Sequence, residues 1–163
     1  MRQYGQALTD GETAGGVTSL VFRAGALLCA LPLDEVIETM RPLATRPLAG
    51  TPPYVRGISV MRGVPTPVID VSRLLRGDQG EPERYVAVRT ERGPVALATG
   101  PILGIRDTTA DIGRGHPALL GGGSKSFIAG VGTIDAEPLL LLQSMRAVPD
   151  EVWEAAAATS VPT

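Results

Sequence analysis

The sequence predicts an all-β fold made of two copies of one small unit. The main evidence is an internal repeat, because residues 54–70 read YVRGISVMRGVPTPVID and residues 127–143 read FIAGVGTIDAEPLLLLQ. Matching positions lie 73 residues apart, as from Pro65 to Pro138. A second observation is the series of short apolar segments separated by glycine turns, which is typical of β-hairpins. A unit of about five short strands leaves exposed sheet edges, and closure into a barrel removes them.

The first half begins with a hairpin in TSLVFRAGALLCALPL. Leu20 and Phe22 alternate with their neighbours at the period of a half-buried strand, and Gly25 supplies the turn. Cys29 is the single cysteine, and we expect it to pack in this hairpin as a small hydrophobe. The next segment, LDEVIETMRPL, predicts a turn followed by a short strand over 36–40, which the Arg-Pro pair ends.

The richest segment, AGTPPYVRGISVMRGVPTPVIDVSRLLRG, predicts a second hairpin. Strands over 54–61 and 64–71 flank Arg62 and Gly63, and glycine can adopt the positive φ that a tight turn requires. The two prolines of GVPTP lie two residues apart, so their missing amides face one side. This predicts an edge strand or a bulge. The residues DVSRLLRG then predict a short helical turn.

The second half repeats this order of elements. RYVAVRTERGPVALATGPI again predicts strand, turn and strand, and the second copy of the glycine-containing hairpin follows. Two lobes are therefore expected, at about 17–80 and 81–148. VPDEVWEAAAATS predicts a C-terminal helix over 149–157, with acidic residues favourably placed in its first turn. Residues 1–16 and 158–163 are predicted to be disordered tails.

Composition and charge argue against several functional classes. The chain has 163 residues, enough for one ordinary domain, and a net charge of −2 with a pI near 5.4. This balance and the aromatic content of 4% argue against nucleic-acid binding, which uses basic surfaces and stacking aromatics. Neither a signal peptide nor an apolar run of about 18 residues is visible. We therefore expect a cytoplasmic protein without membrane insertion.

The sequence contains no convincing catalytic or metal-binding pattern. His116 is the single histidine and lies in a glycine-rich loop, where histidine is more often solvated than catalytic. One histidine with one distant cysteine makes a poor metal site. GGGSKS departs from the phosphate-binding loop, because Ser124 occupies a glycine position. We expect no enzymatic activity, cofactor or metal. The alternative is a small-ligand-binding or catalytic β-barrel that uses the His116 loop.

Three segments resemble the CheW-like coupling proteins of bacterial chemotaxis: SLVFRAGALLCALPLDEVIETMRP, TPPYVRGISVMRGVPTPVIDVSRLL and FIAGVGTIDAEPLLLL. The likeness covers about residues 18–148. Its most specific parts are the P-x-x-V-x-G-x-x-x-x-R-G spacing from Pro52 to Gly63 and the P-V-I-D at 67–70. The V-x-E at 36–38 adds to it.

The resemblance implies two intertwined five-stranded SH3-like β-barrels in one domain at about 17–157. It also implies a non-catalytic adaptor in signalling arrays beneath the inner membrane. The groove between the barrels would take the helical tip of a methyl-accepting chemoreceptor, and another surface of the first barrel would dock the regulatory domain of a histidine kinase. Carried over by motif, the partner contacts would be Val36, Glu38, Arg56, Gly57, Arg62 and Gly63.

Arg62 is the strongest of these candidates. A turn arginine is not needed for folding, and its guanidinium can form two parallel hydrogen bonds with a partner's carboxylate. Its structural alternative is a surface ion pair, which would contribute only about 0–1 kcal/mol to stability. Four of the other candidates also have a structural alternative. Gly57 and Gly63 can serve backbone shape alone, Val36 can belong to the core, and Glu38 can be a solvated charge.

The chain departs from the family pattern at two positions in its second half. Gly100 stands where the family often has an acidic residue, and Gln143 stands where an aspartate commonly follows the last apolar strand. These departures leave a second functional alternative, a divergent adaptor that serves a different receptor or a chemosensory pathway unrelated to motility.

Overall fold

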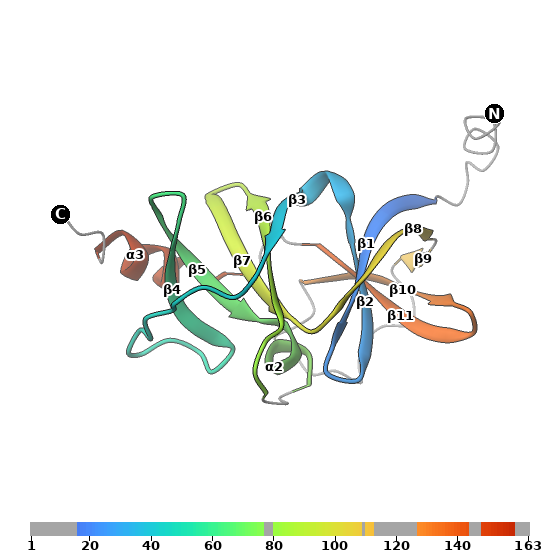
Figure 1. Ribbon diagram of the computed structural model, residues 1–163, viewed down its shortest axis with the longest axis horizontal. Coiled ribbons are helices and arrows are strands. Elements are labelled where there is room, and N and C mark those ends of the chain that lie inside the picture. Colours follow the sequence, from blue (N-terminus) through green and yellow to red (C-terminus); the bar gives the residue numbers. More distant parts are fainter. Residues whose placement is uncertain (1–15, 77–79, 109, 113–126, 144–147, 159–163) are drawn as a thin grey trace.

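The structure is a computed structural model that describes residues 16–76, 80–108, 110–112, 127–143 and 148–158. It is built almost wholly of strands, as predicted, and they form two sheets that lie side by side along the long axis (Figure 1). The strands are β1 (Val17–Ala24), β2 (Leu27–Pro32), β3 (Val36–Met40), β4 (Val55–Met61), β5 (Val64–Asp70), β6 (Arg84–Thr90), β7 (Gly93–Thr99), β8 (Ile102–Thr108), β9 (Ala110–Ile112), β10 (Ile128–Ile134) and β11 (Glu137–Leu142). The helical elements are the 3-10 turn η1 (Leu33–Glu35) and the helices α2 (Val71–Arg76) and α3 (Asp150–Ala158).

The two halves of the sequence exchange a hairpin. One sheet has the order β8-β1-β2-β11-β10-β9, and the other has the order β3-β6-β7-β5-β4. The hairpin β1–β2 thus joins strands of the second half, whereas β6–β7 joins strands of the first half. Each exchanged hairpin is held by a parallel pair, β2 with β11 and β7 with β5. The intertwined arrangement is confirmed, and the three-residue β9 adds a sixth strand to one sheet.

The largest apolar cluster combines side chains from both sheets. Phe22 of β1 and Leu97 of β7 are fully buried in it, and α3 contributes Val152. Complete burial of such a side chain contributes about 1.5–3 kcal/mol to stability. Cys29 belongs to the same cluster, as the sequence predicted, and burial raises the pKa of its thiol to about 12. The thiol is therefore protonated and inert.

The five-stranded sheet curls until its two edges approach each other. Met40 comes from the edge strand β3 and Met61 from the opposite edge strand β4. Both pack into one small cluster with Val68 and Tyr85. Because side chains from both edges share one interior, the sheet closes into a barrel. This was expected, because a small sheet left open would expose its edges.

The internal repeat is a repeat of backbone geometry. The β4–β5 ladder shifts its register within residues 55–57, and the β10–β11 ladder shifts within 128–130, at the equivalent place. The turn residues 62–63 and 135–136 all have positive φ. A β-bulge and a tight turn therefore occur at the same positions of both copies.

The prediction for the two prolines was wrong in one respect. Strand β5 is internal, between β7 and β4, and not an edge strand. However, its pairing with β7 begins only at Val68, so Pro65 and Pro67 pair with β4 alone. Proline has no backbone N–H group to donate. Because both prolines precede the part of β5 that pairs with β7, no sheet hydrogen bond to β7 is lost.

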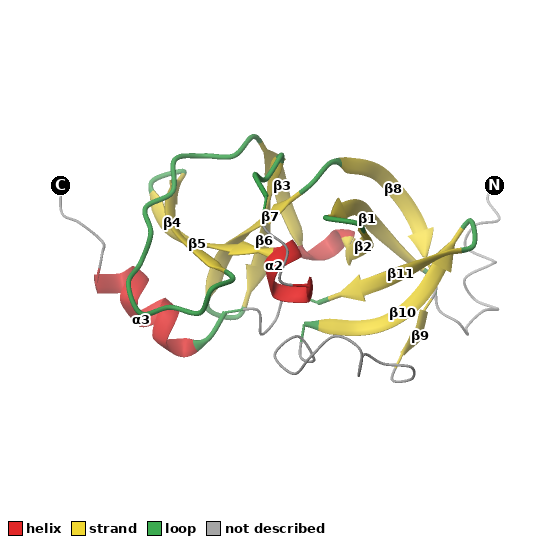
Figure 2. Cartoon of the chain, turned by 90° about the horizontal axis from the view of Figure 1, so that it is seen from below, coloured by secondary structure: helices red, strands yellow, loops and turns green. Residues whose placement is uncertain are grey.

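The C-terminal helix is confirmed within one residue of its expected bounds. In Figure 2, α3 lies beneath β4 and β5, on the side of the molecule opposite β3 and β8. Val152 and Ala156 are buried, and Arg92 of the β6–β7 turn forms an ion pair with Asp150 and lies over the Trp153 ring. Within the described residues, no helix has the length and apolar character needed to cross a membrane.

Candidate partner-binding surface

Glu38 and Arg62, two of the residues selected from the sequence, form an ion pair across the mouth of the five-stranded barrel. Arg62 donates from Nε and from Nη2 to the two carboxylate oxygens of Glu38, each at 2.7 Å. Glu38 lies on the edge strand β3, and Arg62 lies in the turn after the opposite edge strand β4. The pair thus ties together the two edges of the sheet.

The turn geometry places Arg62 where it can reach β3. Arg62 has φ 51° and Gly63 has φ 79°, so both occupy the left-handed region. Two consecutive residues of this kind are typical of the two-residue turns that match the twist of a hairpin. A Cβ on Gly63 would meet no atom within 4 Å, so only the backbone conformation favours glycine there.

The ion pair changes how Arg62 can bind a partner. Its side chain is 78% exposed, whereas that of Glu38 is 28% exposed. The two hydrogen bonds lower the pKa of Glu38 and raise the pKa of Arg62, so both groups stay charged. The fork expected to bind a partner's carboxylate is already occupied by Glu38. Any partner that contacted Arg62 would therefore meet the preformed pair and not a free guanidinium.

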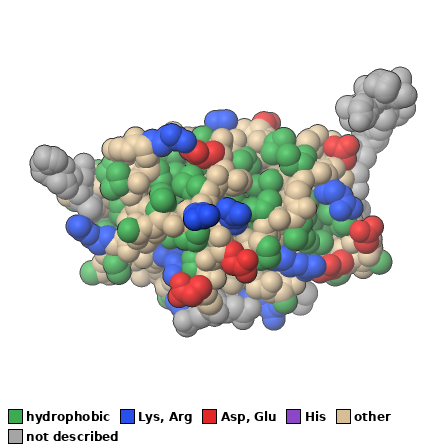
Figure 3. Space-filling view, viewed as in Figure 1, with side chains coloured by type: hydrophobic (Ala, Val, Ile, Leu, Met, Phe, Trp, Pro, Cys, Tyr) green, Lys and Arg blue, Asp and Glu red, His purple; other side chains and the backbone are tan. Residues whose placement is uncertain are grey.

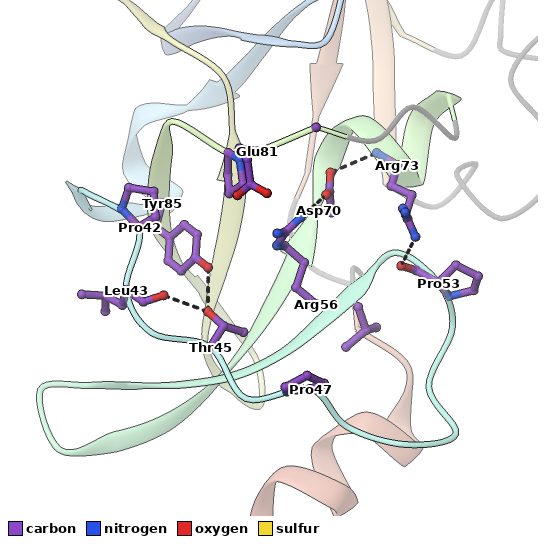
Figure 4. A pocket seen from close by; sticks show the side chains of 13 residues that line it. Pro42, Leu43, Thr45, Pro47, Pro53, Arg56, Asp70, Arg73, Glu81 and Tyr85 are labelled. Atoms are coloured by element: carbon purple, nitrogen blue, oxygen red, sulfur yellow. Dashed lines mark hydrogen bonds and ion pairs between the residues drawn. The ribbon is translucent and has the colours of Figure 1, made fainter.

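Arg56 has a different setting, at the other end of β4. Its Nη1 donates to Asp70 Oδ2 at 2.8 Å, and the side chain of Asp70 is only 8% exposed. The backbone amide of Arg73 donates to Asp70 Oδ1 at 3.1 Å. Figure 4 shows Arg56 and Asp70 pointing toward each other inside a cavity of about 750 Å³, with Glu81 on another wall. This pair holds the start of α2 against β4.

Gly57 and Val36 have clear structural roles. Gly57 has φ 137°, and a Cβ there would overlap the carbonyl oxygen of Arg46. The chain comes this close because Arg46 and Ile58 exchange two backbone hydrogen bonds, at 2.8 and 2.9 Å. Val36 is half-buried and packs against the main core. For these residues the structural alternative explains their presence without a partner.

The six selected residues do not form one continuous site. Glu38 and Arg62 meet, with Gly63 beside them, whereas Arg56 and Gly57 lie near the start of β4. A strand rises about 3.3 Å per residue, so the five residues from Gly57 to Arg62 span roughly 16 Å. The two groups lie at opposite ends of one hairpin.

Two exposed valines lie beside the Arg62–Gly63 turn, and sequence reasoning missed them. They lie on opposite faces of the hairpin, because Val64 pairs with Met61 and Val60 pairs with Pro65. Val60 is 65% exposed near the end of β4, and Val64 is exposed at the start of β5. The strands were predicted, but not which face is covered, and this depends on how the barrel curls. We call Glu38, Val60, Arg62 and Val64 the hairpin-tip surface.

A second exposed surface lies where the two sheets meet. A cavity of about 420 Å³ between the end of β3 and the start of β8 is lined by Arg41, Pro42, Glu83, Arg84, Pro101 and Ile102. Further along β8, Leu103 is 54% exposed and Ile105 is 57% exposed. We call these eight residues the junction surface. In Figure 3 the middle of this face carries basic side chains with hydrophobic areas on both sides.

The exposure of Leu103 arises from a β-bulge that the sequence does not reveal. The β1–β8 ladder passes from Gly104 directly to Ile102 and leaves Leu103 without a partner. The β3–β6 ladder likewise leaves out Ile37, which is also exposed. Bulges turn side chains away from the regular alternation and often occur beside binding sites.

The structure gives a physical reason for one departure from the family pattern. Gly100 donates its backbone amide to the carbonyl of Arg23 at 2.8 Å, and a Cβ there would lie 2.9 Å from that oxygen. A side chain at position 100 would therefore separate β7 from β1. Gln143 directly follows β11, and its backbone amide donates to the backbone carbonyl of Phe127. His116 lies outside the described residues.

Nothing in the described side chains resembles a metal site, since no group of three or more His, Cys, Asp or Glu residues converges there. The sequence matches the CheW-like domain family over residues 18–151. The chain belongs to the CheW-like domain family. It is therefore a scaffold or adaptor of chemotaxis signalling and not an enzyme, which rules out the catalytic alternative.

A solved structure supports the same fold. The scaffolding protein TtCheW from Thermoanaerobacter tengcongensis superposes on this CheW-like chain with a TM-score of 0.70 and 18% sequence identity. The match covers 80% of this chain and 91% of that one. A comparison with curated protein sequences found no match.

Proposed function

We propose that this CheW-like protein couples the helical tips of methyl-accepting chemoreceptors to the regulatory domain of a histidine kinase. The protein would act in the cytoplasm at receptor arrays on the inner membrane, and it would hold its partners in a fixed geometry. The observation that carries the proposal is the Glu38–Arg62 pair, a preformed charged unit on an exposed hairpin that also carries two exposed valines.

The hairpin-tip surface is the part we assign to the kinase regulatory domain. A turn that closes the barrel needs no exposed valines, and an exposed ion pair contributes only about 0–1 kcal/mol to stability. Together they combine apolar contact with charge, which suits a modest and exchangeable interface. Val36, Gly57 and Gly63 would support this surface through the backbone and the core, and Arg56 would hold the far end of the hairpin.

The junction surface is the part we assign to the receptor. It lies between the edge strands of the two sheets and exposes Leu103 and Ile105. A groove that is bordered by exposed apolar side chains suits an amphipathic helix or a helical hairpin. The two partners would then use different surfaces and could bind at the same time.

The kinase assignment can be tested with the purified regulatory domain. Arg62→Ala removes both hydrogen bonds to Glu38 and leaves that carboxylate unpaired at the interface. We expect about tenfold weaker binding, because an interfacial charge loses its partner. The circular dichroism spectrum should not change, since the pair is exposed.

Arg92→Ala is the matched control. Arg92 is another exposed turn arginine of the same barrel with an ion pair, here to Asp150. It should bind the kinase domain as the wild type does. Wild-type affinity of Arg62→Ala, or equal losses in the two variants, would remove the hairpin tip from the interface.

A further inference from the structure

The junction surface carries two arginines of like charge side by side. Strands β3 and β6 are antiparallel, and their last pair is Met40 with Tyr85. The residues that continue the two chains past this pair are Arg41 and Arg84, and both line the junction cavity. Like charges that lie close together repel each other, so this placement does not itself stabilise the fold.

Neither arginine is neutralised within the described part of the chain. Arg41 and Arg84 are exposed, and neither side chain makes a hydrogen bond or an ion pair with the described residues. Glu83 lines the same cavity but forms no ion pair with either of them. By contrast, Arg23, Arg56, Arg62 and Arg92 all have carboxylate partners. The junction thus keeps an excess of positive charge.

Apolar side chains adjoin this charge. Pro101 and Ile102 line the cavity beside the arginines, and Leu103 and Ile105 continue along β8. Figure 3 shows basic side chains at the middle of this face, with hydrophobic surface on either side. The site therefore offers two guanidinium groups next to an aliphatic strip.

We infer that Arg41 and Arg84 select the occupant of the junction: a helical segment with an apolar face and an acidic residue that lies over the two arginines. Apolar contacts with β8 would supply affinity, and the charge would exclude helices that carry a basic residue at that place. The inference rests on the proposed function, because the occupant is taken to be the receptor's helical hairpin.

The test measures binding of a receptor cytoplasmic hairpin fragment to the full chain by titration calorimetry at low and high salt. Arg41→Glu/Arg84→Glu should weaken binding about tenfold at low salt, because attraction is replaced by repulsion. The loss should shrink at 0.5 M salt, where screening is strong. Arg41→Lys/Arg84→Lys keeps both charges and should bind within about twofold of the wild type. Arg46→Glu and Arg84→Glu change the net charge of the protein by the same amount. Arg46→Glu therefore controls for net charge, because Arg46 is exposed beside β4 and does not line the junction cavity.

A further variant separates the charge inference from the assignment of the junction surface to the receptor. Leu103→Asp should abolish binding whether or not charge selects the occupant, since it places a carboxylate in the apolar strip. Loss in Leu103→Asp with unchanged affinity in the double reversal would overturn the charge inference and leave the receptor assignment standing. If the wild-type chain does not bind the fragment, both the charge inference and the receptor assignment are overturned.

Discussion

The two copies of the repeated hairpin, β4–β5 and β10–β11, share a backbone but carry opposite charges at their tips. In the first copy, Arg62 reaches the edge strand β3 and forms two 2.7 Å hydrogen bonds with Glu38. In the second copy, the equivalent turn residue is Asp135, which approaches Arg106 of the edge strand β8 at 3.8 Å. Both members of the second pair are more than half exposed.

This difference separates the requirements of the fold from those of function. The bulge and the left-handed turn occur in both hairpins, which indicates that they belong to the shared backbone and not to one binding surface. The sign of the charge at the tip is reversed, so the fold does not require a particular sign. The side chains that differ between the copies are therefore the better candidates for partner recognition.

The largest effect is expected where the first hairpin is most tightly constrained. Gly57→Ala would force a Cβ into the Arg46 carbonyl and place alanine at φ 137°. We expect the free energy of unfolding to fall by about 3 kcal/mol, combining backbone strain with displacement of the loop. Chemical denaturation monitored by circular dichroism measures this.

Gly63→Ala is the control for that prediction. Position 63 has positive φ but open space, and its counterpart in the second hairpin is already an alanine, Ala136. A net loss of about 0.5 kcal/mol is expected, because the left-handed cost to alanine is partly offset by the smaller freedom of alanine in the unfolded chain. Equal losses in the two variants would show that the close approach of Arg46 costs nothing.

The second hairpin should gain stability from the residue that the first one uses. Ala136 has φ 69°, in the region where glycine is unstrained. The left-handed conformation costs alanine about 1–2 kcal/mol, and glycine loses about 0.5–1 kcal/mol through its greater freedom when unfolded. Ala136→Gly should therefore stabilise the protein by about 0.5 kcal/mol in the same denaturation assay. A destabilised variant would contradict the equivalence of the two turns.

The smallest effect concerns the titration of Glu38. Because Arg62 lowers the pKa of Glu38 in the folded state, the pair stabilises the fold above the ordinary carboxyl pKa of about 4.3. That stability is lost as the pH falls through the lowered value. In a carbon-13 NMR titration, Arg62→Ala should raise the pKa of Glu38 toward its ordinary range. An unchanged pKa would mean that the pair does not persist in solution.

Much of this fold could be predicted from the sequence because its signals are local. The hairpins were predicted from alternating apolar residues, turn glycines and the internal repeat. The family was indicated by the motif around Arg62. The exchange of hairpins between the sheets came only from the family resemblance, since strand pairing depends on contacts distant in sequence. The position of the prolines on an internal strand was missed for the same reason.

The site was less predictable than the fold. The motif selected Glu38 and Arg62, but only the structure shows that they bind each other. Leu103 is exposed because of a bulge, and Arg41 lies near Arg84 because of strand register. Neither feature has a sequence signal at the level of single residues. The family motif also selected Gly57, whose role in the structure is to admit the Arg46 carbonyl.

The most direct test exchanges the charges at each hairpin tip and measures binding of the kinase regulatory domain. Glu38→Arg/Arg62→Glu reverses the first pair, and Arg106→Asp/Asp135→Arg reverses the second, each with no change in net charge. We predict that the first variant folds normally but binds the kinase domain at least tenfold more weakly, whereas the second binds like the wild type. Equal affinities for both variants, or a loss confined to the second, would contradict the account.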